Sequence, residues 1–127
     1  HLPELQEYAR LTRKPIFVPS VGNFRQGMLV SVPLHLDTLP GKPKVAELQE
    51  ALAAYYAGST FVGVLPGEAN GKIEAEALND TNRLELRVFG NEESGQAVLV
   101  ARLDNLGKGA SGAAVQNMRL MLGLPEG

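Results

Sequence analysis

The sequence contains no cysteine and no tryptophan, and aromatic residues make up only 6% of its 127 residues. The lack of cysteine excludes disulfides, thiolate metal sites and a cysteine nucleophile within this chain. Its two histidines, His1 and His35, lie far apart in sequence, so we expect no histidine metal cluster and no bound metal. The small number of aromatic side chains gives little support for base stacking on single-stranded nucleic acid.

A strong charge of one sign and long apolar runs are missing as well. Lys and Arg number 12 against 14 Asp and Glu, and the resulting net charge of −2 argues against a nucleic-acid partner. No apolar run reaches the length of a membrane span and no signal-peptide pattern is present, so we expect no membrane role. The first residue is His1 rather than Met, which indicates a trimmed chain or a piece of a longer protein.

What the sequence does contain is the composition of one soluble domain, 1–127, with 44% hydrophobic residues. Alternation and short apolar runs predict strands, and helical spacing predicts helices. We therefore expect an α+β domain with a mostly antiparallel or mixed sheet of about five strands. Two helices are expected to cover one face of that sheet and leave the other for a partner. The predicted strands are 16–18, 28–36, 61–65, 83–88 and 97–103, and the predicted helices are 1–11, 45–57 and 109–122.

Two of the predicted strands carry residues that indicate their surroundings. Pro33 cannot donate to a hydrogen-bond ladder, so it indicates an edge strand or a bulge. Arg83, Glu85 and Arg87 alternate with apolar residues, which predicts a half-exposed strand that carries a mixed-charge surface or interface rather than an anion site.

The segment 104–112, DNLGKGASG, follows a predicted strand and opens a predicted helix. Free backbone N–H groups at a helix start, together with Lys108, can form an anion site, and glycines let a ligand approach the backbone. The glycine spacing is not that of a P-loop. The alternative is a helix of small residues that packs tightly on another helix, and the residues alone leave both interpretations open.

Two further places are candidates for chemistry. Glu4 lies one helical turn after His1, a spacing at which a carboxylate can orient an imidazole for proton transfer. The alternative there is a frayed chain end or the remnant of a tag. Arg25 and Gln26 lie in a glycine-bearing loop between strands, where substrate contacts are common, although a plain surface loop is the alternative.

Three segments together resemble the N-acetyl-gamma-glutamyl-phosphate reductase family, and its shorter bacterial form in particular. They are HLPE at 1–4, FVPSVGNFRQGM at 17–28 and DNLGKGASGAAVQN at 104–117. The resemblance extends over essentially the whole chain. It implies a catalytic and dimerisation domain like the C-terminal domain of glyceraldehyde-3-phosphate dehydrogenase. The implied reaction is the NADP-dependent conversion of N-acetyl-glutamyl 5-phosphate to N-acetyl-glutamate 5-semialdehyde, a cytoplasmic step of arginine biosynthesis.

The resemblance also implies roles for individual residues. His1 falls on the second histidine of the family motif His-x-His-x-Pro-Glu, which implies acid–base work near a cysteine thiolate, with Glu4 steadying the imidazole. A second set matches the segment that approaches the nicotinamide end of NADP. This cofactor-binding set is Asn105, Gly107, Lys108, Gly109 and Ala110.

The sequence departs from the family in having neither a Rossmann fingerprint nor a cysteine. We therefore expect this chain to be half of a reductase, cut near His1, and inactive alone. The resemblance implies that the helix 109–122 packs on an N-terminal Rossmann domain, which binds most of the NADP. It also implies an acyl phosphate as the small-molecule substrate and a homodimer or larger assembly through a sheet face. The alternative is a non-catalytic dimerisation or ligand-binding module with the same fold.

Overall fold

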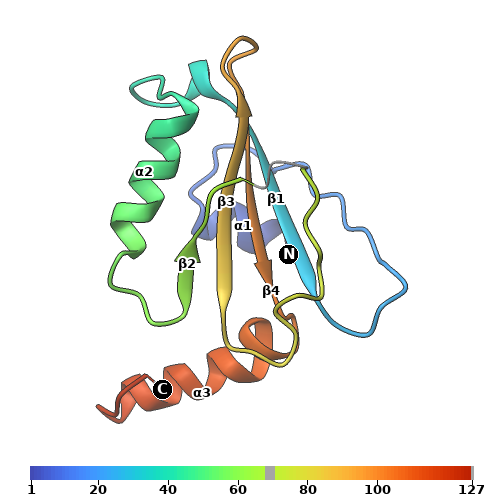
Figure 1. Ribbon diagram of the computed structural model, residues 1–127, viewed down its shortest axis with the longest axis vertical. Coiled ribbons are helices and arrows are strands. Elements are labelled where there is room, and N and C mark those ends of the chain that lie inside the picture. The colour runs from blue at the N-terminus through green and yellow to red at the C-terminus, as the bar shows by residue number, and fades with distance from the viewer. Residues whose placement is uncertain (68–70, 127) are drawn as a thin grey trace.

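The computed structural model describes residues 1–67 and 71–126, and it confirms the expected α+β class (Figure 1). Three α-helices and four strands account for its regular structure within those ranges. In chain order the elements are α1 (Leu2–Tyr8), β1 (Met28–His35), a 3₁₀ turn (Leu36–Thr38), α2 (Val45–Tyr56), β2 (Val62–Val64), β3 (Leu84–Asn91), β4 (Gln96–Leu103), a π-helical turn (Gly107–Ser111) and α3 (Gly112–Met121).

The four strands form one mixed sheet in the order β1-β4-β3-β2. β4 pairs antiparallel with both β1 and β3, whereas β2 runs parallel to β3. Pro33 lies in β1 at the sheet edge, as its missing N–H predicts. The register pairs Met28 of β1 with Leu103 of β4 and Leu103 with Leu84 of β3, so these three residues mark one end of the sheet.

The expected fifth strand, 16–18, is wrong, because that segment is extended chain without a ladder. Prolines at positions 15 and 19 flank it, and proline has no N–H with which to extend a ladder. Ile16 and Val18 are 93% and 78% exposed, so these two side chains of the apolar run that predicted a strand are not part of a core.

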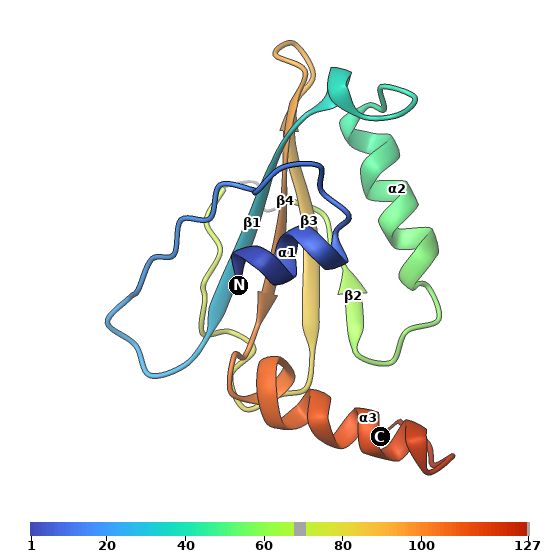
Figure 2. The same ribbon diagram turned by 180° about the vertical axis from the view of Figure 1, so that it is seen from behind.

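The two faces of the sheet differ. The register places Val88 and Leu99 on one face, called here the helix face, and Glu85 and Arg102 on the other, called the charged face. α2 covers the helix face, where Leu36, Val88 and Ala97 form the buried cluster and Val45, Leu48 and Leu52 of α2 pack against it. α1 lies on the same side of the sheet (Figure 2), so the expectation of two helices on one face is confirmed.

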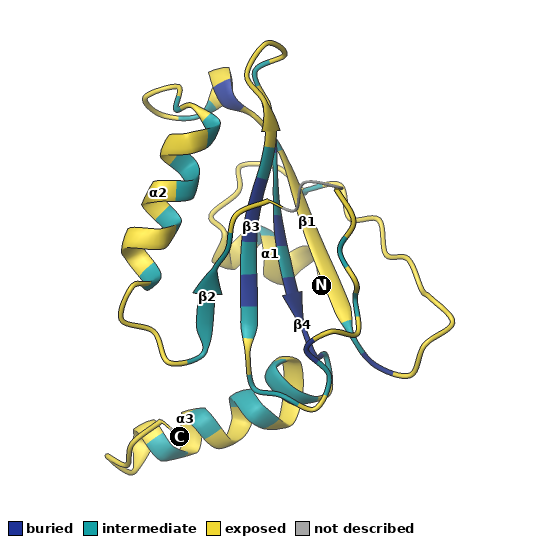
Figure 3. Cartoon of the chain, viewed as in Figure 1, coloured by how far each residue is buried: buried dark blue, intermediate teal, exposed yellow. Residues whose placement is uncertain are grey.

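Burial is uneven across the sheet (Figure 3). β3 and β4 hold most of the buried residues, whereas β1 is exposed along nearly its whole length. The chain between β2 and β3 passes over the charged face, where Arg102 Nη1 donates to the Glu74 carbonyl at 3.2 Å. β1 therefore presents half-exposed apolar side chains, Val30 and Val32 on the helix face and Leu29 on the charged face.

The predicted C-terminal helix, 109–122, is shorter and begins differently. A π-helical turn precedes α3, because the Gly109 N–H donates to the Asp104 carbonyl and the Ser111 N–H to the Leu106 carbonyl, both five residues back. No helix within 1–67 and 71–126 combines the length and apolar character needed to cross a membrane.

Candidate functional site

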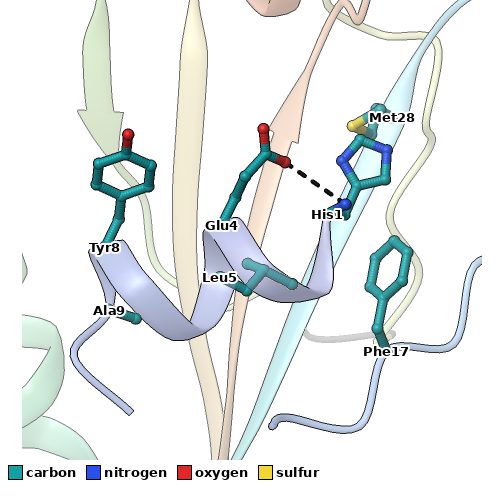
Figure 4. Close-up of a pocket in the computed structure, with 7 residues that line it drawn as sticks. All are labelled: His1, Glu4, Leu5, Tyr8, Ala9, Phe17 and Met28. Carbon is teal, nitrogen blue, oxygen red and sulfur yellow. Dashed lines mark ion pairs between the residues drawn. The ribbon is translucent and has the colours of Figure 1, made fainter.

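The predicted site residues lie in two places. His1 and Glu4 are at the start of α1, while the other candidates gather at the sheet end where β1 begins and β4 ends, called here the polar end (Figure 1). The first place is a cavity of about 640 Å³ between α1, the chain that follows it and the start of β1 (Figure 4). Its lining is His1, Glu4, Leu5, Tyr8, Ala9, Phe17 and Met28.

The side chains of His1 and Glu4 share the first turn of α1, which Pro3 favours because its fixed φ suits a helix start. The His1 ring lies against the Phe17 ring, with centroids 5.8 Å apart and planes at 59°. Glu4 Oε2 is 3.5 Å from the amino group of His1 rather than paired with its imidazole (Figure 4). The imidazole therefore borders the cavity, and its orientation by the Glu4 carboxylate stays a prediction.

The second place is a cavity of about 540 Å³ at the polar end. It brings Arg25, which the sequence offered as a substrate contact, close to Asn105, which the resemblance placed beside the cofactor. Loop 20–27 forms most of its wall, and residues from β1, from the chain before β3 and from the chain after β4 complete it. The lining is Ser20, Val21, Gly22, Phe24, Arg25, Gln26, Gly27, Met28, Leu29, Ala75 and Asn105.

Gln26 is buried, which a substrate contact in a surface loop would not require. Its Nε2 donates to Asp80 Oδ1 at 2.9 Å and to Asp104 Oδ2 at 3.2 Å. Its backbone carbonyl accepts a hydrogen bond from Asn79 Nδ2 at 3.3 Å. The amide is thus engaged within the protein, and Gln26 fixes the loop that carries Arg25.

Gly27 is a position where only glycine fits. Its φ is +110°, and a Cβ there would lie 2.6 Å from the Ala75 carbonyl oxygen. The Gly27 N–H donates to Asn105 Oδ1 at 2.7 Å. The side chain of Asn105, a predicted cofactor contact, therefore also holds the end of loop 20–27.

Asp104 is the most buried polar residue at the polar end, with 1% of its surface exposed. Its Oδ1 accepts the Leu106 N–H at 2.8 Å, and its Oδ2 accepts the Asp80 N–H at 2.8 Å. Burial raises the pKa of Asp104, but hydrogen bonds from the backbone of Leu106, Asp80 and Gly107 and the charge of Arg25 outweigh it, so the pKa lies below its ordinary value. Sequence reasoning missed this residue, although an Asp between a buried strand and a glycine-rich turn is a signal for such capping.

In the rest of the 104–112 segment, some residues pack against the protein and others are exposed to solvent. A Cβ on Gly107 would lie 2.6 Å from the Thr81 carbonyl oxygen, so this glycine allows close packing, although on the turn before β3 and not on another helix. Lys108 Nζ donates to Gln116 Oε1 at 2.5 Å and lies 5.3 Å from the centre of the Phe61 ring. Gly109 and Ala110 are exposed, so their small side chains leave the backbone of the turn open to a flat ligand.

A buried ion cluster lies on the charged face of the sheet, on β3 and β4, next to the polar end. Glu85 Oε2 accepts Arg87 Nη1 at 2.9 Å and Arg102 Nε at 3.0 Å, and it also contacts Arg102 Nη2. Burial raises the pKa of Glu85, but hydrogen bonds and charge from Arg102 and Arg87 together hold it below its usual range. The mixed-charge surface predicted for this strand is wrong for Glu85 and Arg87, because the chain between β2 and β3 covers them.

In the described ranges, no group of three or more His, Asp or Glu residues is arranged to hold a metal ion.

Comparisons with known proteins give one consistent result. Residues 1–105 match the family model described as semialdehyde dehydrogenase, dimerisation domain. Proteins named N-acetyl-gamma-glutamyl-phosphate reductase from Brucella suis, Brucella ovis and Brucella canis are each 56% identical to this chain over 126 residues. The matches cover 97% of this chain and 41% of each relative. The chain therefore spans about two fifths of the length of these curated relatives.

Proposed function

Because the chain belongs to the semialdehyde dehydrogenase dimerisation-domain family, we propose that it is the catalytic and dimerisation half of an N-acetyl-gamma-glutamyl-phosphate reductase. The observation that carries the proposal is 56% identity over nearly the whole chain to relatives of that name. The reaction converts the acyl phosphate, NADPH and a proton into N-acetyl-glutamate 5-semialdehyde, NADP⁺ and phosphate. It belongs to arginine biosynthesis and takes place in the cytoplasm.

The proposal divides the work between two domains. The sequence supplies no cysteine, so the nucleophilic thiolate comes from the other part of the protein. That part is an N-terminal Rossmann domain, which also binds most of the NADP. α3 suits the contact between the two, because Val115, Met118 and Leu122 are about half or more exposed and form an apolar surface beside the turn at 107–111.

The turn before α3 fits the nicotinamide end of the cofactor. Gly109 and Ala110 expose backbone without a large side chain, and Lys108 supplies a cation at the same turn. When bound, the cofactor supplies the hydride. This chain would bind and orient the cofactor with the surface formed by Asn105, Gly107, Lys108, Gly109 and Ala110. Gly107 allows the turn to pack closely on Thr81.

His1 carries the proton chemistry in this proposal. Imidazole is the side chain best suited to exchange protons near neutral pH, so that of His1 can take the proton of the thiol and return one to the product. The supporting observation is its position on an open cavity, where the apolar side chains of Leu5, Phe17 and Met28 form part of the lining. Arg25 binds the anionic substrate, while Gln26 contributes indirectly, by holding the Arg25 loop.

Association of two copies through the charged face of the sheet completes the proposal. The family model is that of a dimerisation domain, and Leu29 and Pro33 of β1 are exposed on this face next to the half-buried Val98 of β4. Such an apolar strip beside a buried ion cluster is suited to a second copy. Sedimentation at micromolar concentration should show a dimer or larger species, and a monomer throughout that range would contradict this part.

The deciding experiment compares two histidine variants in the two-domain protein. NADPH oxidation with N-acetyl-glutamyl phosphate is expected from the two-domain protein and not from this chain alone. His1→Asn should slow single-turnover reduction by about 10²- to 10⁴-fold with little change in NADP affinity. His35→Asn, the matched control at the exposed end of β1, should leave the rate unchanged. An unchanged single-turnover rate in folded His1→Asn would overturn the acid–base assignment.

A further inference from the structure

One buried carboxylate joins three segments that are distant in the sequence. Asp104 accepts hydrogen bonds from Gln26 at the end of the Arg25 loop, from Asp80 in the turn before β3, and from Leu106 at the start of the π-helical turn. Gln26 is 78 residues away along the chain. Gln26 makes the reciprocal contacts, because its amide donates to both Asp80 and Asp104.

The two outer segments are the ones to which the site was assigned. Arg25 directly precedes Gln26, and Lys108 follows Leu106 by two positions. A second bond runs in parallel between the same segments, from the Gly27 N–H to Asn105 Oδ1. Asp104 and Asn105, which follow β4, therefore bind Gln26 and Gly27, which precede β1. Two parallel hydrogen bonds restrict the movement of one segment relative to the other.

We propose that Asp104 is a positioning residue that sets the Arg25 loop and the Lys108 turn in a single mutual arrangement. The role of that arrangement in substrate and cofactor binding rests on the proposed function, whereas the mechanical link itself does not. Asp104 touches neither ligand in this scheme and acts through Gln26 and Leu106.

The chemistry of the position requires a carboxylate. The groups that act on Asp104 are donors or positive: the Gln26 amide donates to it, as do the backbone N–H groups of Asp80, Leu106 and Gly107, and the charge of Arg25 also favours the carboxylate. A carboxylate accepts at both oxygens, while an asparagine amide turned either way points its NH₂ group at one of these donors. The Gln26 amide in turn donates to both Asp80 and Asp104, so it separates two carboxylates that would otherwise repel each other.

The test measures hydrogen–deuterium exchange in the two-domain protein. Asp104→Asn should speed exchange at 23–27, and Gln26→Met should speed it at 106–111, each by about tenfold or more, because a broken link lowers the free energy of local opening. Each variant is read in the segment it does not belong to, so loss of its own bond does not count. The double variant should give no further acceleration beyond the larger single effect.

Two controls separate this link from general effects. Asp37→Asn makes the same carboxylate-to-amide change at an exposed position and should leave both segments unchanged. Val88→Ala lowers global stability in the core under α2 and should leave local exchange at 23–27 and 106–111 unchanged. The link is disproved if residues 23–27 exchange as slowly in Asp104→Asn as in the wild type. It is also disproved if residues 106–111 exchange as slowly in Gln26→Met as in the wild type.

Kinetics supply the second measurement. Asp104→Asn and Gln26→Met should each raise the KM for the acyl phosphate and for NADPH together, although neither side chain contacts either ligand. Val88→Ala should leave both KM values unchanged, since a purely structural loss reduces only the amount of folded enzyme. A wild-type protein without reductase activity would overturn the proposed function, and the exchange result would still decide for or against the link.

Discussion

The half of the sheet under α2 and the polar end are held by opposite kinds of contact. Under α2, Leu36, Val88 and Ala97 are buried against aliphatic side chains of the helix. At the polar end and on the charged face behind it lie the buried polar residues of the described chain, Gln26, Glu85, Arg87, Arg102 and Asp104. Apolar packing accepts many side chains of suitable volume, whereas a buried polar network is stable only when each donor and acceptor is matched. The first region therefore builds the fold, and the second fixes one geometry at the site.

The largest effect should come from the ion cluster. Glu85→Leu removes the carboxylate that neutralises the buried Arg102 guanidinium, and breaking a buried pair in this way costs about 3–5 kcal/mol of unfolding free energy. Glu93→Leu in the exposed β3–β4 turn is the matched control and should change stability little. Urea unfolding of both variants measures the difference. A loss below about 1 kcal/mol for Glu85→Leu would show that the polar region does not depend on matched charges.

A smaller loss should follow from trimming the apolar region. Val88→Ala removes two buried methyl groups under α2 and should cost about 2 kcal/mol, with the spread set by how far α2 can relax into the space. Val32→Ala is the same substitution on the same face of the sheet, but Val32 is 45% exposed on β1. Its cost in urea unfolding should be well below that of Val88→Ala. Equal losses would mean that β1 is covered in solution, as it would be in a dimer that uses this face.

The next smaller effect is on how the unfolding free energy depends on pH, which should differ between variants of the polar end and variants of the apolar region under α2. Unfolded Asp and Glu titrate near pKa values of about 3.9 and 4.3, and the folded pKa values of Asp104 and Glu85 are lower. Their stabilisation is thus fully present above pH 5 and is lost as the pH falls through the folded pKa values. Unfolding free energies measured from pH 6 to pH 3 should fall more steeply for the wild type than for Asp104→Asn. Val88→Ala should keep the wild-type slope, and identical slopes in all three would contradict the assignment.

The same contrast explains what the sequence could predict. The helix over 45–57 and the strands over 28–36 and 97–103 lie within a few residues of α2, β1 and β4, because periodic apolar residues report burial on one face. The polar end could not be read in this way. Gln26 looked like a loop residue free for substrate, yet its amide is bonded to Asp80 and Asp104, which lie 54 and 78 residues further along the chain. Long-range polar pairing has no periodic signal in a single sequence.

Glu85 and Arg87 illustrate the same limit in the other direction. Alternation with apolar residues predicted that they face solvent, and the rule identified the correct face of β3. It could not predict that the chain between β2 and β3 crosses that face and covers them, with Arg102 bonded to the Glu74 carbonyl. The resemblance to known reductases located His1 and the 104–112 segment. The role of Asp104 within that segment, as the link to the loop that carries Arg25, came only from the geometry.

The smallest effect on stability should come from replacing Lys108, which lies in the π-helical turn at the polar end. Lys108→Ala removes one hydrogen bond to Gln116 and a cation–π contact with Phe61, together worth about 1 kcal/mol or less at a partly exposed position. The same variant of the two-domain protein should weaken NADP binding measured by fluorescence titration, because it removes the cation of the turn that faces the cofactor. Lys72→Ala is the control for a lost positive charge elsewhere and should leave NADP affinity unchanged.

The carboxylate of Asp104, and not Lys108, holds the turn. Loss of the lysine should therefore leave hydrogen–deuterium exchange at residues 23–27 as slow as in the wild type. A Lys108→Ala protein with unaltered NADP affinity would remove that residue from the cofactor surface and leave the backbone at Gly109 and Ala110 to form it.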